Sequence, residues 1–184
     1  MEDAQDDDNA KVGAPAYDSF LDGIRESGSP HVTAIGHSYG SLTVGQATPQ
    51  PGGIPADDVV LVGSPGVGVD TADLGVGADH VYVGAAENDQ VTNLPTPNLL
   101  EYVAPGSEYG PKKNWFGTDP ADNHFGGHHF SVAPGEDTGL TGLMTGDLPA
   151  HSIYFDPVEG GDSLNNIASV VAGHGDKIQT VEPR

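Results

Sequence analysis

The sequence contains no cysteine among its 184 residues. This absence excludes disulfide bonds, thiolate metal sites and a cysteine nucleophile. No apolar stretch approaches the length of a membrane-spanning helix, and the acidic N-terminus lacks the basic and apolar regions of a signal peptide. We therefore expect a cytoplasmic protein, with a secreted form as the alternative if the natural N-terminus is longer.

Basic residues are also scarce. Six lysines and arginines stand against 27 aspartates and glutamates, which gives a formal net charge of −21. A field of this sign repels nucleic acids and anionic membranes, so neither is expected as a partner. The simplest interpretation of the acidity is a strongly solvated surface, for example one adapted to high salt, where screening relieves self-repulsion.

The length and the lack of a dividing linker predict a single domain. A chain of 184 residues suffices for one compact core, and 27 glycines and 15 prolines indicate many loops. Residues 1–13 are acidic and show no periodicity, which predicts a disordered tail. The domain itself is expected over residues 14–184.

Short apolar runs predict the strands. They lie at residues 31–35, 59–62 and 80–83, and a shorter strand is expected at residues 129–132. Because these runs are continuous rather than alternating, they favour strands that are buried on both faces. We therefore expect an α/β fold with a doubly wound, mostly parallel sheet.

Helical patterns alternate with these strands. A first helix is expected between Pro15, which suits a first turn, and Gly28, which suits a stop. A second helix of small residues should follow the first strand. A third is expected at residues 163–172, with Asp162 as its cap.

The first strand runs into the segment Gly36-His37-Ser38-Tyr39-Gly40, which fits the pattern G-x-S-x-G. A strand before this pattern and a helix after it expose the serine hydroxyl on a sharp turn, which makes Ser38 the candidate nucleophile. The two flanking glycines are expected to be needed because a side chain there would clash. The alternative interpretation is a glycine-rich loop whose serine only caps the helix.

A serine needs a base and an orienting acid, and in this class of turn the chain order is serine, acid, histidine. Asp89 follows the third strand, at the edge where sites form in parallel sheets, and is the candidate acid. Glu87 is the alternative acid. Among the eight histidines, His151 is the best candidate base because it lies between the last strand and the last helix. The alternative interpretation of His151 is an ordinary histidine in a surface loop.

The other histidines receive different interpretations. His31 and His80 begin strands and are interpreted as structural. His124, His128 and His129 could suggest a metal cluster, but no carboxylate or cysteine stands at convincing ligand spacing. No metal and no cofactor is therefore predicted.

Four residues are candidates for the oxyanion hole and the pocket. The amide of Tyr39 is the natural first oxyanion donor, because it follows the serine at the start of a helix. His37 lies in the turn, with its side chain expected to point away from Ser38. Ser64 and Pro65 follow the second strand and are expected to line the pocket.

Several blocks resemble a known family. VTAIGHSYGSLTVG, DDVVLVGSPGVGVDTADLGV, HVYVGAAENDQV and AHSIYFDP followed by SLNNIASVVAG look like the actinobacterial α/β-hydrolase family long catalogued as a domain of unknown function (DUF1023). The resemblance covers about residues 16–173. It implies a doubly wound parallel sheet, with the nucleophile at Ser38, the acid at Asp89 and the base at His151.

The sequence departs from that pattern at its N-terminus. Members of the wider fold carry several strands before the nucleophile strand, and one early loop donates the second oxyanion N–H. Here the turn is preceded by about thirty residues, which predict a tail and one helix. We therefore expect an α/β-hydrolase-like domain reduced at its N-terminus, either as a fragment or as a reduced version that finds its second donor elsewhere. A missing half-sheet would leave an exposed strand edge, through which a homodimer could form.

These features predict a serine hydrolase that cleaves a small or medium carboxylic ester through a Ser-His-Asp triad and an acyl-enzyme intermediate. The partner expected is thus a small-molecule ester. The alternative function is a non-catalytic remnant of the fold that acts as a binding or structural module.

Overall fold

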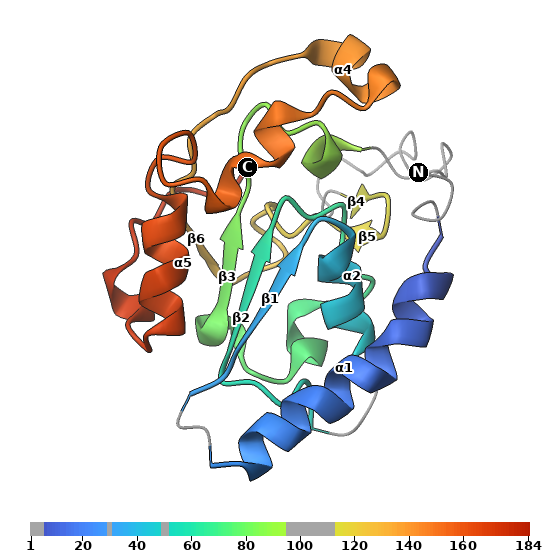
Figure 1. The fold of residues 1–184 in the computed structure, drawn as a ribbon, viewed down its shortest axis with the longest axis vertical. Coiled ribbons are helices and arrows are strands. Elements are labelled where there is room, and N and C mark those ends of the chain that lie inside the picture. The colour runs from blue at the N-terminus through green and yellow to red at the C-terminus, as the bar shows by residue number, and fades with distance from the viewer. Residues whose placement is uncertain (1–5, 29–30, 49–51, 95–112) are drawn as a thin grey trace.

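The computed structural model describes residues 6–28, 31–48, 52–94 and 113–184. Its centre is a four-stranded sheet in the order β1-β2-β3-β6, in which every pairing is parallel (Figure 1). The strands are β1 (Thr33–His37), β2 (Asp58–Val62), β3 (Val81–Gly84) and β6 (His128–His129). This confirms the predicted α/β fold, although β1 begins two residues later than expected.

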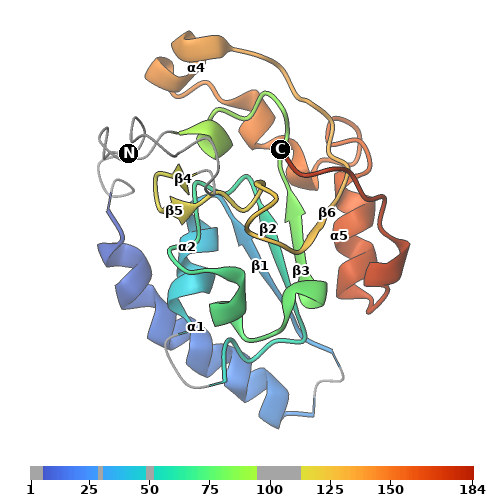
Figure 2. The same cartoon turned by 180° about the vertical axis from the view of Figure 1, so that it is seen from behind.

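Helices cover the two faces of the sheet. Helices α1 (Asp8–Glu26) and α2 (Tyr39–Gln46) lie on one side, and α5 (Ser163–Val171) lies on the other (Figures 1 and 2). All five residues of β2 are buried, because this central strand packs against both helical layers. Alternate β2 residues therefore belong to two cores, with Val59 and Leu61 in one and Val60 and Val62 in the other.

Helix α1 starts earlier than the sequence predicted. It is helical from Asp8, so the expected disordered tail is wrong for residues 8–13; residues 1–5 lie outside the described part. Two contacts explain the difference: Lys11 pairs with Asp7 one turn earlier at 2.7 Å, and the Ala10 N–H donates to the Tyr39 hydroxyl at 3.1 Å. Pro15 lies inside the helix and not in its first turn.

The two edges of the sheet differ. Beside β6, the C-terminal segment runs antiparallel, with Ser131 N–H donating to the Gln179 carbonyl and Val181 N–H donating to the His129 carbonyl, both at 2.8 Å (Figure 2). At the other edge, β1 pairs only with β2 among the described residues. The side chain of Ile35 at this edge is 36% exposed.

Loops and short elements complete the fold. Helix α4 (Gly139–Thr145) was not predicted, and β4 (Lys113–Asn114) and β5 (Gly117–Thr118) form a small antiparallel hairpin. Asp162 is the N-cap residue of α5 as expected, but its side chain makes no capping hydrogen bond. The 3₁₀ turns are Thr71–Leu74, Ala78–His80, Val91–Asn93, Pro149–His151, Ile153–Phe155 and Gly175–Lys177.

In the described parts of the chain, no helix has both the length and the apolar character needed to cross a bilayer.

Candidate active site

Ser38 sits on a strained turn between β1 and α2. Its backbone has φ 55° and ψ −131°, and it is the one non-glycine residue with positive φ in the described part of the chain. The Ser38 N–H donates to the Val62 carbonyl at 3.0 Å, which ties the turn to the end of β2. Such a conformation costs about 1–3 kcal/mol and is typical of functional positions.

The two glycines beside this turn are not equivalent. A Cβ on Gly36 would lie 2.6 Å from the Ser41 Cα, so a side chain there would clash with the backbone of α2. A Cβ on Gly40 would meet nothing within 4 Å. The expected steric need is therefore confirmed for Gly36 and wrong for Gly40, which faces open space.

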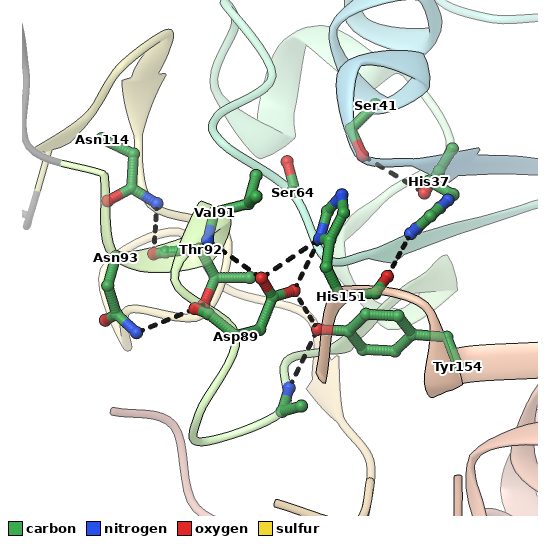
Figure 3. A network of polar contacts seen from close by, with 12 residues as sticks. His37, Ser41, Ser64, Asp89, Val91, Thr92, Asn93, Asn114, His151 and Tyr154 are labelled. Atoms are coloured by element: carbon green, nitrogen blue, oxygen red, sulfur yellow. Dashed lines mark hydrogen bonds and ion pairs between the residues drawn. The ribbon is translucent and has the colours of Figure 1, made fainter. Parts of the chain in front are cut away.

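His151 and Asp89 form the central polar contact of the site (Figure 3). The His151 Nδ1 lies 2.9 Å from Oδ2 of Asp89 and 3.1 Å from Oδ1. Asp89 is 0% exposed, whereas Glu87, the alternative acid, is exposed. The structure therefore pairs the histidine with the first of the two candidate acids.

The Asp89 carboxylate is held in its charged form. Burial alone would raise its pKa, but hydrogen bonds from His151 and Tyr154 and from the Val91 N–H keep the pKa below its ordinary value. The Val91 N–H donates to Oδ1 at 2.9 Å, and the Thr92 hydroxyl donates to the Asp89 carbonyl at 2.9 Å. A buried, ionised acid is thus oriented by the loop that follows β3.

Tyr154 is a site residue that the sequence interpretation missed. Its hydroxyl donates to Oδ2 of Asp89 at 2.6 Å and accepts the Ala86 N–H at 3.0 Å. The signal that could have found it is its spacing, because Tyr154 follows His151 by three residues. Two side chains at this spacing in 3₁₀ geometry point to the same side.

The strained turn lies next to the His151–Asp89 pair. A Cβ added to Gly63, the residue after Val62, would lie 3.1 Å from both the Asp89 Oδ2 and the His151 Cε1. On the other flank of the turn, the ring of His37 lies 4.8 Å from the ring of His151. The carboxyl ends of β1, β2 and β3 therefore place the Ser38 turn, Gly63 and the loop with Asp89 at one edge of the sheet. The 3₁₀ turn that carries His151 packs onto this edge from a later part of the chain.

His37 has its own role in this arrangement. Its Nε2 donates to the main-chain carbonyl of His151 at 2.8 Å, and its ring also approaches Tyr154 and Phe155. Burial lowers the pKa of His37, which favours the neutral ring. The side chain thus turns toward His151, and its hydrogen bond supports the loop that carries this residue.

The pocket candidates contact both their own turn and the distant residue Phe116. The Ser64 hydroxyl is buried and accepts the Gly66 N–H at 3.2 Å, while the Pro65 carbonyl accepts the Phe116 N–H at 3.0 Å. The ring of Tyr39 packs edge-on against Phe116 at 5.7 Å. Because α2 begins at Tyr39, its first amides have no acceptor within the helix and lie beside Ser38.

The remaining histidines contact separate partners. His31 and His80 both bind Asp58, at 2.9 and 2.8 Å, which agrees with their structural interpretation. His124 pairs with Asp122 at 2.7 Å, and the ring of His128 stacks on Tyr82. Within the described ranges, no three histidine or acidic residues group in a way that could hold a metal ion.

Comparisons with known proteins agree with this architecture. A family model described as alpha/beta hydrolase matches residues 1–99, more than half of the chain. An uncharacterized protein of Mycobacterium tuberculosis is 34% identical over 179 residues, which cover 92% of this chain and 26% of that protein. An uncharacterized protein of Mycobacterium bovis is 38% identical over 111 residues, which cover 58% of this chain and 40% of that protein.

The chain therefore spans about a quarter of the length of the M. tuberculosis relative. No solved structure matches it significantly. On the family match and the parallel sheet together, this chain belongs to the alpha/beta hydrolase family.

Proposed function

We propose that the chain is a serine hydrolase that cleaves carboxylic esters, with Ser38 as nucleophile, His151 as base and Asp89 as orienting acid. The observation that carries the proposal is the His151–Asp89 hydrogen bond of 2.9 Å beside the one strained serine turn of the described chain. A helix-capping serine needs neither this strain nor a buried acid–base pair next to it.

In the first half of the proposed reaction, the Ser38 Oγ attacks the ester carbonyl carbon. Its proton passes to the Nε2 of His151, and the charge of Asp89 stabilises the imidazolium that forms. The tetrahedral intermediate then collapses, the C–O bond of the ester breaks, and His151 returns the proton to the leaving alkoxide. The products of this half are an alcohol and an acyl group bound to Ser38.

In the second half, water attacks the acyl carbon while His151 accepts its proton. The bond to Ser38 then breaks, the serine regains a proton from His151, and the carboxylic acid leaves. In both halves the oxyanion is expected near the Tyr39 amide, because the N-terminus of α2 favours negative charge there.

An ester is the favoured substrate class because its alkoxide leaving group needs less assistance than an amine. The apolar ring of Phe155 is 43% exposed beside His37 and offers a surface for a small or medium acyl chain.

We also propose that the chain falls within the narrower DUF1023 group, because the sequence blocks around Ser38 and Ser64 resemble that group.

Labelling with a fluorophosphonate probe tests the nucleophile directly. We expect one adduct on Ser38, loss of that adduct in Ser38→Ala, and strongly slowed labelling in His151→Ala. Ser19→Ala is the matched control, because this serine is exposed on α1 and its hydroxyl bonds only the local Pro15 carbonyl. Equal labelling of wild type and His151→Ala would overturn the proposal.

Turnover of p-nitrophenyl esters separates the enzyme from the non-catalytic module that is the alternative. In subtilisin, an unrelated serine hydrolase, loss of a triad member lowers kcat by about 10⁴-fold or more, and we expect the same order for Ser38→Ala here. Circular dichroism should be unchanged, since the Ser38 backbone contact to Val62 does not involve the side chain. A folded wild type that turns over no ester from acetate to octanoate would favour the binding module.

A further inference from the structure

Tyr154 is a buried tyrosine with both sides of its hydroxyl engaged (Figure 3). It lies in the 3₁₀ turn Ile153–Phe155 and is 0% exposed. The hydroxyl donates its proton to Oδ2 of Asp89 at 2.6 Å and accepts the Ala86 N–H at 3.0 Å. Its position is therefore fixed by the loop after β3, which also carries the acid.

The Asp89 carboxylate accepts hydrogen bonds from two side chains. Its Oδ2 accepts a hydrogen bond from the Tyr154 hydroxyl, and the Nδ1 of His151 lies 2.9 Å from the same oxygen. Oδ1 receives the Val91 N–H. Because the acid is fully buried, these donors take the place of water around it.

We propose that Tyr154 is a positioning residue of this site: its phenol fixes the Asp89 carboxylate and limits how strongly that carboxylate favours a proton on His151. Its importance for catalysis rests on the proposed function, in which His151 is the base. The physical reason is that a hydrogen bond to a charged acceptor stabilises the charge locally. A carboxylate so stabilised attracts the imidazolium less than a carboxylate without this bond.

The spacing along the chain supports this role. His151 ends one 3₁₀ turn, Pro149–His151, and Tyr154 lies in the next. The two side chains, three residues apart, both reach the Asp89 carboxylate. One short segment thus supplies both the base and the phenol.

Two other groups face this cluster. The ring of His37, at the end of β1, lies 5.7 Å from the ring of Tyr154. Arg184, in the C-terminal segment, donates to the Thr92 hydroxyl at 2.8 Å and acts electrostatically on Tyr154. Burial and the Asp89 carboxylate raise the pKa of Tyr154 far above its ordinary value, so its phenol stays a donor at any pH of use.

Tyr154→Phe tests the proposal, because it removes the hydroxyl and keeps the ring. We expect the NMR titration midpoint of the His151 imidazole to rise by about half to one pH unit. The His151 signal is assigned by its loss in His151→Asn. The acid limb of kcat/KM should move upward by the same amount. Tyr17→Phe on α1 is the control, since Tyr17 packs on the opposite core and should move neither quantity.

A second variant keeps the test decisive if Tyr154→Phe folds poorly. Site-specific 3-fluorotyrosine at position 154 has nearly the same shape and a more acidic phenol. It should strengthen the bond to Asp89 and move the His151 titration downward, opposite to phenylalanine. A His151 midpoint that stays unchanged in both variants would overturn the proposal.

The NMR readout also separates this proposal from the proposed function. If the His151 titration shifts as expected but wild type cleaves no ester, the positioning role stands and the hydrolase proposal fails. If wild type cleaves esters but both variants keep the wild-type titration and acid limb, only the role of Tyr154 fails.

Discussion

The Nε2–H of His37 donates to the main-chain carbonyl of His151 at 2.8 Å, across 114 residues of sequence, and the two rings lie 4.8 Å apart. His37 immediately precedes Ser38, so this bond ties the strained Ser38 turn to the segment that carries His151. The sequence analysis placed His37 among the oxyanion and pocket candidates, with its side chain pointing away from Ser38. The structure shows that this side chain connects the Ser38 turn with the His151 segment.

Replacing His37 by phenylalanine should keep the ring packing and remove this donor. The His151 carbonyl then loses its partner, which should lower the free energy of unfolding by about 1 kcal/mol. Because a small displacement of His151 weakens proton transfer, kcat should fall by roughly tenfold to a hundredfold with little change in KM. Urea unfolding and ester kinetics measure the two effects. An unchanged kcat would contradict the connection.

The His37→Phe variant also tests the lowered pKa of His37, through the pH dependence of stability. Burial lowers the pKa of His37, so below about pH 6.5 the unfolded chain takes up a proton that the folded chain does not. Stability of the wild type should therefore fall as pH drops from 7.5 toward 5, and His37→Phe should lose part of this fall. His129, whose pKa burial also lowers, provides the same background in both proteins. Parallel stability curves for the two proteins would contradict a half-buried His37 ring that stays neutral in the folded protein.

Alanine at Gly36 and at Gly40 should have opposite effects on stability. At Gly36 the new Cβ would meet the Ser41 Cα at 2.6 Å, and overpacking of this kind costs roughly 1–3 kcal/mol. At Gly40, inside α2, the Cβ meets nothing and alanine should gain about 0.5–1 kcal/mol through helix propensity. Thermal unfolding of the pair measures the contrast, and equal destabilisation by both would contradict the observed asymmetry.

Sequence patterns predicted the elements whose causes are local. The apolar runs gave the strands of the sheet because a strand buried on both faces must be apolar throughout, as β2 is. The G-x-S-x-G pattern located the strained turn at Ser38, because the conformation depends on residues within the turn itself. Chain order then selected Asp89 and His151, which the structure brings into contact.

Features that depend on distant residues could not be predicted in this way. Helix α1 extends back to Asp8 because its first turn contacts the Tyr39 hydroxyl, far along the chain. The spacing of Tyr154 from His151 suggests a shared side of the chain, but its hydrogen bond to Asp89 depends on a loop 65 residues away in sequence. The two glycines of the turn look alike in sequence, yet only Gly36 faces the backbone of α2.

The outer edge of β1, which no other strand of the described residues pairs, leads to the last prediction, self-association through this strand. Val32 and Ser38 both bond to the segment of β2, so in a parallel ladder the backbone groups of Thr33, Ile35 and His37 face outward. Two copies could pair these groups antiparallel about Ile35. The net charge of −21 opposes association at low salt, whereas 1 M NaCl shortens the screening length to about 3 Å. We therefore expect the dimer fraction to rise with salt.

Sedimentation equilibrium at 0.1 and 1 M NaCl measures this association, and Ile35→Lys should abolish it by placing a charge at the centre of the pairing. Val12→Lys is the matched control, since it adds the same charge at an exposed position on α1, away from the edge. Equal dimer fractions for wild type and Ile35→Lys would exclude β1 as the interface. A wild type that stays monomeric at both salt concentrations would exclude self-association itself, because screening removes the repulsion that opposes it.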